Sequence, residues 1–330
     1  MQLRKVKISG TGKYLPEQQI TAEEMDQKLN VKKGWVQKKT GVHTRHFVQD
    51  ETASQMGAEA SKEAMENAGL NFSDIDCLVC TSGTVEQAIP CTASLIQKEL
   101  GEEYSGIPSF DINSTCLSFL TGLDVMSTLV AAGTYHHVLL VASEVASVGL
   151  NWSHKESAAL FGDGAAAVII SRDENSESSR IVYSNMETYS AGAELSQIRG
   201  GGTKIHPRNT SEIEPFLFEM DGKAIYKLTS KVLPGFIDAL LSTTALQMND
   251  FDLVVTHQAS AMAMRLMAKK VGITDEQLMY ILPTHGNMIA ASIPLAIHEA
   301  ITQKRIKRGD RVLLLGTSAG LSLGGMVLEY

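Results

Sequence analysis

The stretch "DFDLVVTHQA", Asp250–Ala259, decides the fold because it repeats the pattern of "DIDCLVCTSG", Asp74–Gly83. Each stretch has an acidic start, a short apolar run typical of a strand, and polar residues where that strand ends. Two more pairs recur in the same order: "KVKISG" (Lys5–Gly10) with "RIVYSN" (Arg180–Asn185), and "HVLLVASE" (His137–Glu144) with "RVLLLGTS" (Arg311–Ser318). The sequence therefore predicts two duplicated halves.

Helical patterns occupy matching places in the two halves. Glu51–Gly69 and Asp221–Leu241 both carry apolar residues at helical spacing. Short strands that alternate with such helices indicate an α/β protein with parallel strands covered by helices. The polar segment Ser171–Arg180 is the expected junction, so we predict halves at residues 1–172 and 173–330.

Composition limits the possible functions. The chain has 330 residues, 44% hydrophobic, and a net charge of −8, which argues against broad binding to nucleic acid. Neither a signal peptide nor a membrane-spanning run is evident, so we expect a soluble protein of the cytoplasm. Its four cysteines are too few for a disulfide framework and are expected to be reduced thiols: Cys77, Cys80, Cys91 and Cys116.

Reactive side chains follow three of the predicted strands. In parallel α/β sheets, ligands bind outside the carboxyl ends of the strands, where Cys116, His257 and Asn287 fall. Cys116 also starts an apolar helical pattern, and a helix N-terminus is expected to lower the pKa of its thiol, which would make it a nucleophile. The alternatives are a buried structural thiol, a satisfied core histidine and a helix-capping asparagine.

Three other motifs carry weaker functional signals. Cys77 and Cys80 form a C-x-x-C inside a strand, a poor context for redox chemistry. "GTSAG", Gly316–Gly320, matches a hydrolase nucleophile elbow, but no histidine follows it. The basic segment Asn30–His46 surrounds Trp35, so it is either a solvated face or a phosphate site with an aromatic platform.

Taken in order, these motifs resemble a known family. They are "GTGKYLPEQQIT" (Gly10–Thr21), "WVQKKTG" (Trp35–Gly41), "IPCTA" (Ile89–Ala93), the cysteine after "FDIN" (Phe110–Asn113), "FGDGAAA" (Phe161–Ala167), "HQAS" (His257–Ser260) and "HGNMIAAS" (His285–Ser292). The chain is similar to the thiolase-fold condensing enzymes, and most closely to β-ketoacyl-acyl carrier protein synthase III.

The resemblance implies a five-layered αβαβα fold, a homodimer, and a catalytic triad of Cys116, His257 and Asn287. It implies acyl transfer from acyl-coenzyme A (acyl-CoA) to Cys116, with an oxyanion held by the backbone of Cys116, Ala319 and Gly320. A decarboxylative condensation with malonyl-acyl carrier protein (malonyl-ACP) or malonyl-CoA then gives a 3-oxoacyl thioester. No metal or redox cofactor is expected.

The resemblance also implies contacts with the substrates. Trp35 would stack on the coenzyme A adenine, with Lys39 and Lys155 near its phosphates, Lys227 toward the carrier protein and Ile89 at the acyl pocket.

Several positions depart from the pattern of fatty-acid initiation enzymes. Arginine is usual at Lys39, Lys155 and Met262, asparagine at Ser260, phenylalanine at Ile89, and a triple glycine at Ser318–Gly320. Two other activities on this fold stay open: head-to-head condensation of two acyl-CoA chains, which uses a glutamate where Ile89 stands, and acyl transfer to an amine or hydroxyl. A non-catalytic scaffold is the remaining alternative.

Overall fold

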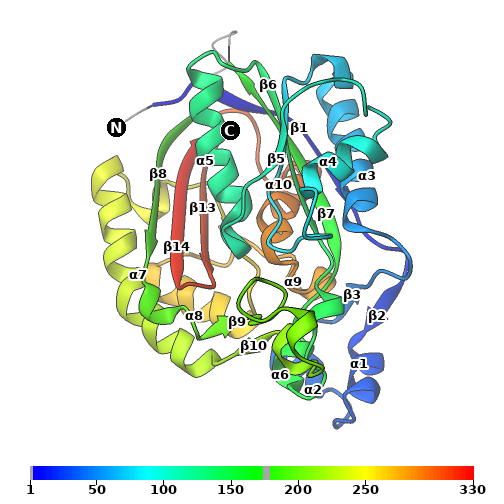
Figure 1. Ribbon diagram of the computed structural model, residues 1–330. Helices are drawn as coiled ribbons and strands as arrows, with labels where there is room; N and C mark the ends of the chain where they lie inside the picture. The colour runs from blue at the N-terminus through cyan, green and yellow to red at the C-terminus, as the bar shows by residue number, and fades with distance from the viewer. Residues whose placement is uncertain (1–2, 174–178) are drawn as a thin grey trace.

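The computed structural model describes residues 3–173 and 179–330 and contains two five-stranded sheets (Figure 1). The first sheet has the order β1 (Val6–Tyr14), β7 (Gly164–Arg172), β6 (His137–Glu144), β4 (Cys77–Cys80) and β5 (Ser109–Asp111). The second has the order β8 (Arg180–Thr188), β14 (Ser322–Glu329), β13 (Arg311–Ser318), β11 (Leu253–Thr256) and β12 (Leu278–Met279).

The two sheets have the same topology. In the first, β4 runs parallel to β5 and β6, whereas β7 is antiparallel to β6 and β1. In the second, β11 is parallel to β12 and β13, whereas β14 is antiparallel to β13 and β8. The predicted duplication is confirmed. The predicted division at 172/173 falls between β7 and β8 and stays a prediction, because residues 174–178 of the polar segment lie outside the described residues.

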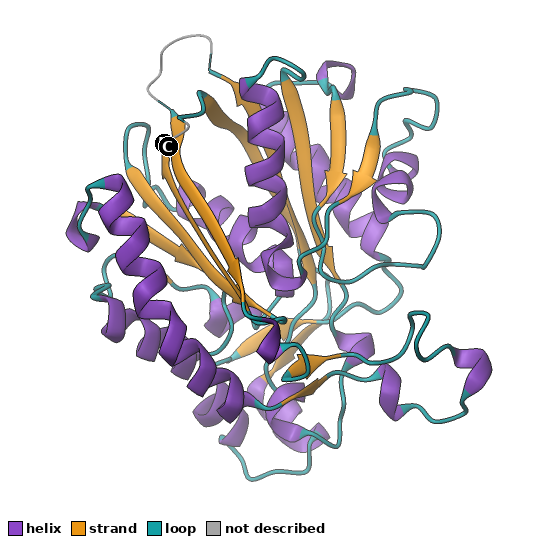
Figure 2. Ribbon diagram, turned by 60° about the vertical axis from the view of Figure 1, so that its left-hand side comes forward, coloured by secondary structure: helices purple, strands orange, loops and turns teal. Residues whose placement is uncertain are grey.

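Helices and sheets form five layers (Figure 2). One outer layer holds α3 (Ala53–Ala68) and α4 (Thr92–Glu99), the middle layer holds α5 (Ser118–Ala131) and α10 (Ser292–Thr302), and the other outer layer holds α7 (Gly222–Thr244) and α8 (Ala261–Val271). This is the predicted αβαβα arrangement, and the helices predicted at Glu51–Gly69 and Asp221–Leu241 are α3 and α7.

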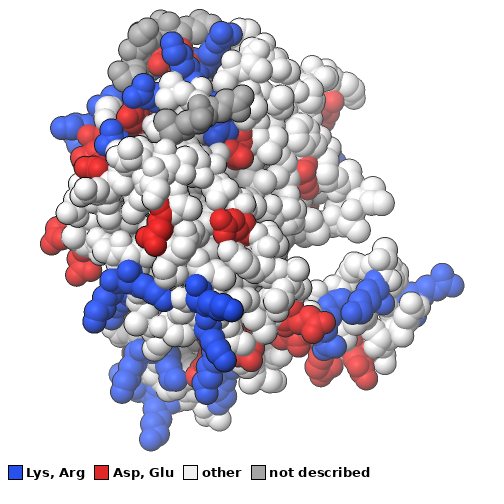
Figure 3. Space-filling view, turned by 90° about the vertical axis from the view of Figure 1, so that its left-hand side faces the viewer, with Lys and Arg blue, Asp and Glu red and all other residues white. Residues whose placement is uncertain are grey.

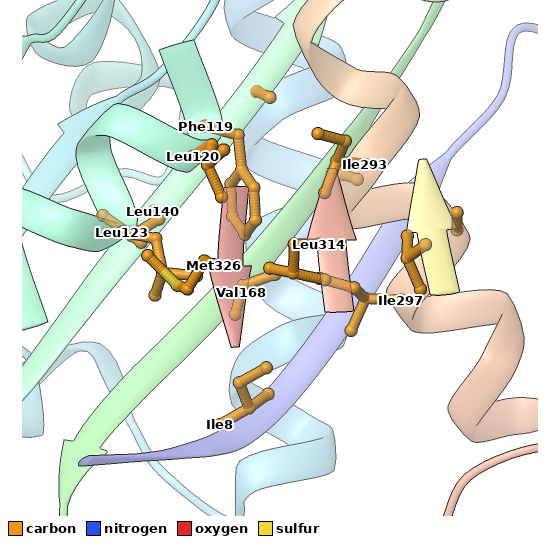
Figure 4. Close-up of a cluster of buried hydrophobic side chains, with 14 of the residues drawn as sticks. Ile8, Phe119, Leu120, Leu123, Leu140, Val168, Ile293, Ile297, Leu314 and Met326 are labelled. Atoms are coloured by element: carbon orange, nitrogen blue, oxygen red, sulfur yellow. The ribbon is translucent and has the colours of Figure 1, made fainter. Parts of the chain in front are cut away.

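The middle layer is the core that the two halves share (Figure 4). Phe119 and Leu123 of α5 and Ile293 of α10 are buried between strands of both sheets, including Leu140 of β6 and Leu314 of β13. A helix that is covered on both sides needs apolar residues nearly all round, which is why the sequences of α5 and α10 are so apolar.

The outer helix α3 lies directly on the backbone of β1. An added Cβ at Gly10 would lie 2.2 Å from the carbonyl oxygen of Ala64, and one at Gly12 would lie 2.2 Å from that of Ala60. Only glycine permits this approach, so the first outer layer is held closely against its sheet.

Shorter elements connect the layers. In the described part of the chain they are β2 (Gln19–Thr21), α1 (Ala22–Lys28), α2 (Trp35–Thr40), β3 (Thr44–His46), α6 (Lys155–Ala158), β9 (Ser196–Gln197), β10 (Glu219–Met220), α9 (Leu282–His285) and eight 3₁₀ turns: η1 (Phe72–Asp74), η2 (Thr115–Leu117), η3 (Ser147–Gly149), η4 (Ser190–Gly192), η5 (Pro207–Asn209), η6 (Glu214–Phe216), η7 (Met248–Asp250) and η8 (Ile289–Ala291). Within residues 3–173 and 179–330, no helix is both long and apolar enough to span a bilayer.

Candidate active site

Both middle-layer helices start with the same tight turn. The turn η2 leads into α5 and η8 leads into α10, and their first residues, Thr115 and Ile289, have φ angles of 51° and 46°. Positive φ is uncommon for β-branched residues, so each turn needs support from its surroundings. An asparagine two residues upstream gives it: Oδ1 of Asn113 accepts from the N–H of Thr115, and Oδ1 of Asn287 accepts from that of Ile289, both at 2.9 Å.

The amide nitrogens of these asparagines are also used alike. Nδ2 of Asn113 donates to the carbonyl of Gly83 at 3.2 Å, and Nδ2 of Asn287 donates to that of Ala259 at 3.4 Å. Asn287 therefore has Asn113 as its counterpart in the first half. By the same register, the counterpart of Cys116 is Ala290.

Cys116 lies inside η2 at the start of α5 and is half-buried. Backbone hydrogen bonds from Cys116 and Ala319 reach its thiol and favour the thiolate. Burial outweighs them and, together with the nearby carboxylate of Glu144, raises the pKa of the thiol to about 12. The expected lowering of this pKa was therefore wrong, because the helix start is enclosed by protein and faces a buried carboxylate. The resting thiol is protonated at neutral pH.

His257 follows β11 and is buried beside the second turn. Its backbone N–H donates to the carbonyl of Leu315 at 2.9 Å, and its imidazole has a backbone hydrogen bond with Ile289. Burial lowers the pKa of the imidazole to about 4, so the ring is neutral at physiological pH. Its Nδ1 has no hydrogen-bond partner within the part of the chain that the structure describes.

The loops that carry the three predicted residues converge. The turn η2 packs against η8 and β13. An added Cβ at Gly316 of β13 would lie 2.8 Å from Leu117 and 3.2 Å from His257. Asn287 joins the same region, since its Nδ2 donates at 3.4 Å to the carbonyl of Ala259, two residues after His257. The cysteine of one half thus meets the histidine and asparagine loops of the other.

Trp35 and Lys39 lie on α2, close to α6. The ammonium of Lys39 lies 5.9 Å from the ring centre of Trp35 and forms an exposed ion pair of 3.0 Å with Glu156. Lys155 of α6 donates to the carbonyl of Asn30 at 3.3 Å. The structure therefore groups these three predicted residues on one surface, with Lys39 already paired.

Lys227 lies apart from that surface, on the exposed face of α7. Basic side chains gather over the lower part of the face formed by α7 and α8 (Figure 3). Exposed members of this surface are Lys223, Lys227 and Lys231 of α7 and Arg265, Lys269 and Lys270 of α8. Met262, 66% exposed, adds an apolar side chain to α8.

Ile89 lies in the loop between β4 and α4 and is 85% exposed, so it lines no cavity within its own chain. Glu86, in the same loop, accepts a hydrogen bond of 2.7 Å from the N–H of Ser54. The acidic residue nearest to Ile89 in this loop is therefore already engaged at the start of α3.

The weaker motifs have structural roles. Cys77 and Cys80 face opposite sides of β4, each inside a different core cluster. "GTSAG" ends β13 and turns into β14, so it opens no helix.

Two buried carboxylates were missed by the sequence analysis. Asp26 accepts from the N–H groups of Gly34 and Val36 at 2.5 and 2.8 Å and so fixes the loop that presents Trp35. Glu144 ends β6 and is wholly buried. Its signal was available, because an acidic residue ends an otherwise apolar strand at the edge where ligands bind.

Comparison with known proteins identifies the family. Residues 110–190 match the family described as 3-oxoacyl-[acyl-carrier-protein (ACP)] synthase III, and residues 241–330 match its C-terminal part. The beta-ketoacyl-[acyl-carrier-protein] synthase III of Vesicomyosocius okutanii is 33% identical over 324 residues, which cover 98% of both chains.

Solved structures agree with this match. The 3-oxoacyl-[acyl-carrier-protein] synthase III of Aquifex aeolicus has a TM-score of 0.88 at 29% identity, covering 98% of this chain and 100% of that one. The enzyme of Pseudomonas aeruginosa has a TM-score of 0.89 at 26% identity, covering 99% and 98%. Since sequence and fold agree over nearly the whole length, the resemblance is confirmed and the chain belongs to the 3-oxoacyl-[acyl-carrier-protein] synthase III family of condensing acyltransferases.

Proposed function

We propose that the protein joins an acyl group to a malonyl-derived two-carbon unit in two steps. In the first, the Cys116 sulfur attacks the thioester of acyl-CoA, a new S–acyl bond forms, and free coenzyme A leaves with the thiol proton. In the second, malonyl-ACP or malonyl-CoA loses carbon dioxide, and its carbanion attacks the acyl group on Cys116 to release a 3-oxoacyl thioester.

The observation that carries this proposal is the pair of N–H groups, from Cys116 and Ala319, directed at the Cys116 thiol. Donors that converge on a nucleophile can also hold the oxygen that becomes negative when a thioester is attacked. Gly320, next along the chain, is the third backbone position that we propose for this oxyanion site.

Neutral His257 and Asn287 are suited to the second step. Oδ1 of Asn287 accepts from the N–H of Ile289, so the amide nitrogen of Asn287 points in the opposite direction. One hydrogen of this nitrogen makes the long contact of 3.4 Å with the carbonyl of Ala259, and the other hydrogen can be donated to the substrate. An imidazole with a pKa of about 4 is neutral and carries a single N–H, which would exchange its backbone partner Ile289 for the substrate carbonyl. Donation from both to the malonyl thioester carbonyl would stabilise the enolate, with no need for a metal or redox cofactor.

The substrates are proposed to approach over the surface of α2 and α6. Trp35 offers a ring for the adenine, and phosphates would replace Glu156 as the partner of Lys39, with Lys155 alongside. Lys227 and the basic surface of α7 and α8 suit an acidic carrier protein, and Met262 adds an exposed apolar side chain near the start of α8.

A homodimer in the cytoplasm is the assembly that we propose. Among the described residues β5 pairs with β4 alone, which leaves one edge of this short strand available. Phe110 on β5 and Tyr104 before it are exposed, as is Ile89. Pairing of two β5 edges would cover these side chains and bring Ile89 of one copy to the acyl pocket of the other.

The test is a panel of acyl-CoA donors of increasing length, each incubated with malonyl-ACP or malonyl-CoA. We expect one acyl mass on the intact protein and its loss in Cys116→Ser, followed by carbon dioxide and a 3-oxoacyl product when a malonyl thioester is added. An unchanged adduct in Cys116→Ser would disprove the nucleophile. Product formation from acyl-CoA alone would point to head-to-head condensation, and product formation only with an added amine or alcohol would point to simple acyl transfer.

A further inference from the structure

Glu144 is a buried carboxylate that lies between the two halves. It is the last residue of β6 and has no solvent exposure. Its Oε1 accepts from the N–H of Gly83 at 2.5 Å and from that of Ala290 at 3.3 Å, and its Oε2 accepts from the N–H and the hydroxyl of Thr84 at 3.0 and 2.6 Å. The carboxylate thus joins a loop of the first half to the turn that opens α10 in the second.

In the second half, the Glu144 carboxylate occupies the position that corresponds to the proposed oxyanion site of the first half. Ala290 is the counterpart of Cys116, so its N–H is the second-half equivalent of an N–H that reaches the thiol. Helix starts attract anions because their N–H groups are unpaired. At α10 this attraction is satisfied by an internal anion, Glu144, whereas at α5 the equivalent donors face the sulfur.

The loop that Glu144 holds also touches both site turns. An added Cβ at Gly83 would lie 3.2 Å from the carbonyl of Thr115 and 2.7 Å from the side chain of Ile289. Thr115 precedes Cys116, and Ile289 is the backbone partner of His257. A shift of Gly83 would therefore displace both the thiol and the imidazole.

We propose that Glu144 is a positioning residue that fixes both site turns and whose negative charge opposes ionisation of Cys116. The proposal rests on Cys116 being the nucleophile proposed above. Its test uses alkylation, which needs no acyl donor, so it can fail independently of the proposed reaction.

The pKa values of the neighbouring groups allow the effect of the Glu144 charge on Cys116 to be measured separately from theirs. Burial raises the pKa of Glu144 to about 7. Burial also raises the pKa of Cys80, which Asp111 and Glu144 face, to about 12, and lowers that of His257 to about 4. Of Glu144, Cys80, Cys116 and His257, only Glu144 changes its dominant charge state between pH 6 and 9, so its effect on Cys116 must grow as the pH rises through about 7.

The first experiment measures the rate at which iodoacetamide alkylates Cys116 from pH 6 to 9, by mass spectrometry of the peptide that contains it. We expect Glu144→Gln to react at the wild-type rate near pH 6 and about tenfold faster near pH 9, where the wild-type carboxylate is charged. The matched control is Glu299→Gln, which removes a half-buried carboxylate of α10 that is paired with Lys13 and should leave the profile unchanged. A ratio of variant to wild-type rates that stays constant with pH would overturn the proposal, as would the same change in the control.

A second variant keeps the carboxylate in place and so tests the charge if Glu144→Gln does not fold. The hydroxyl of Thr84 lowers the pKa of Glu144, and Thr84→Val removes this hydrogen bond. The pH at which Glu144 begins to slow alkylation should therefore move upward in Thr84→Val. A profile identical to wild type would overturn the proposal.

Discussion

The two halves of the molecule have the same backbone at the start of their middle helices but different side chains around it. In both, an asparagine supports a tight turn and its amide nitrogen binds a loop carbonyl. The side chains at equivalent positions differ in three pairs: Cys116 and Ala290, His257 and Thr81, Glu144 and Ser318.

This difference separates what the fold supplies from what the sequence adds. The fold supplies two equivalent helix starts, each with N–H donors. A carboxylate fills the site at α10, and the donors at α5 face a thiol. A few side chains therefore give the two equivalent sites different chemistry.

The largest expected effect comes from moving the thiol between the halves. The double variant Cys116→Ala/Ala290→Cys should form an acyl adduct at least about 10³-fold more slowly than wild type, because the N–H at position 290 already binds Glu144. Intact-mass measurement after incubation with acyl-CoA checks this, with Cys116→Ala as the control. An adduct at position 290 would show that the two helix starts are interchangeable.

A smaller effect is expected when the equivalent asparagines are compared. Asn287→Ala should lower carbon dioxide release from a malonyl thioester by about 10² to 10³-fold, as loss of a donor to a developing oxyanion does. Asn113→Ala should keep this rate within a few-fold of wild type but lose about 1–2 kcal/mol of unfolding free energy, since Asn113 supports its turn and the loop of Gly83 but donates to no reacting atom. Equal rates in the two variants would remove Asn287 from the proposed mechanism.

How much of this arrangement the sequence predicts depends on the range of the interactions involved. The duplication and the convergence of Cys116, His257 and Asn287 follow from short strands and from the rule that ligands bind at strand ends. Both are local patterns repeated in a known topology. That is why the two halves and the meeting of the site loops could be predicted, whereas the five layers were implied by the family resemblance.

The electrostatics of the site could not be predicted in this way. The thiol was expected to have a lowered pKa because the helix start was visible in the sequence, whereas the enclosure of Cys116 and its neighbour Glu144 were not. The ion pair of Lys39 with Glu156 joins residues 117 positions apart, and no local signal pairs them. Charge states depend on burial, which only the assembled layers define.

The smallest effects concern the outer layers of the two halves. Helix α3 lies on the glycine backbone of β1, whereas the side chains of Phe236 and Leu240 lie between α7 and Gly325 of β14. Gly10→Ala should therefore lower the unfolding free energy by about 1–3 kcal/mol, because its Cβ has no room.

The matched control lies in the helix of the other half. Gly235 of α7 has open space around it, and Gly235→Ala should raise the unfolding free energy by about 0.5–1 kcal/mol. Urea unfolding of both variants measures these changes. Equal destabilisation by the two substitutions would mean that the packing of α3 on β1 is no closer than that of α7 on its sheet.

The shared middle layer also bears on synthesis at the ribosome. Met326 and Leu328 of β14, the strand of the second sheet that comes last along the chain, complete the core between the sheets. A nascent chain that has already formed the first sheet must keep the inner face of α5 uncovered until β14 has been synthesised. Apolar surface left bare for that long favours aggregation, so chaperone protection during elongation should matter more for this fold than for a protein of equal length built from two self-contained domains.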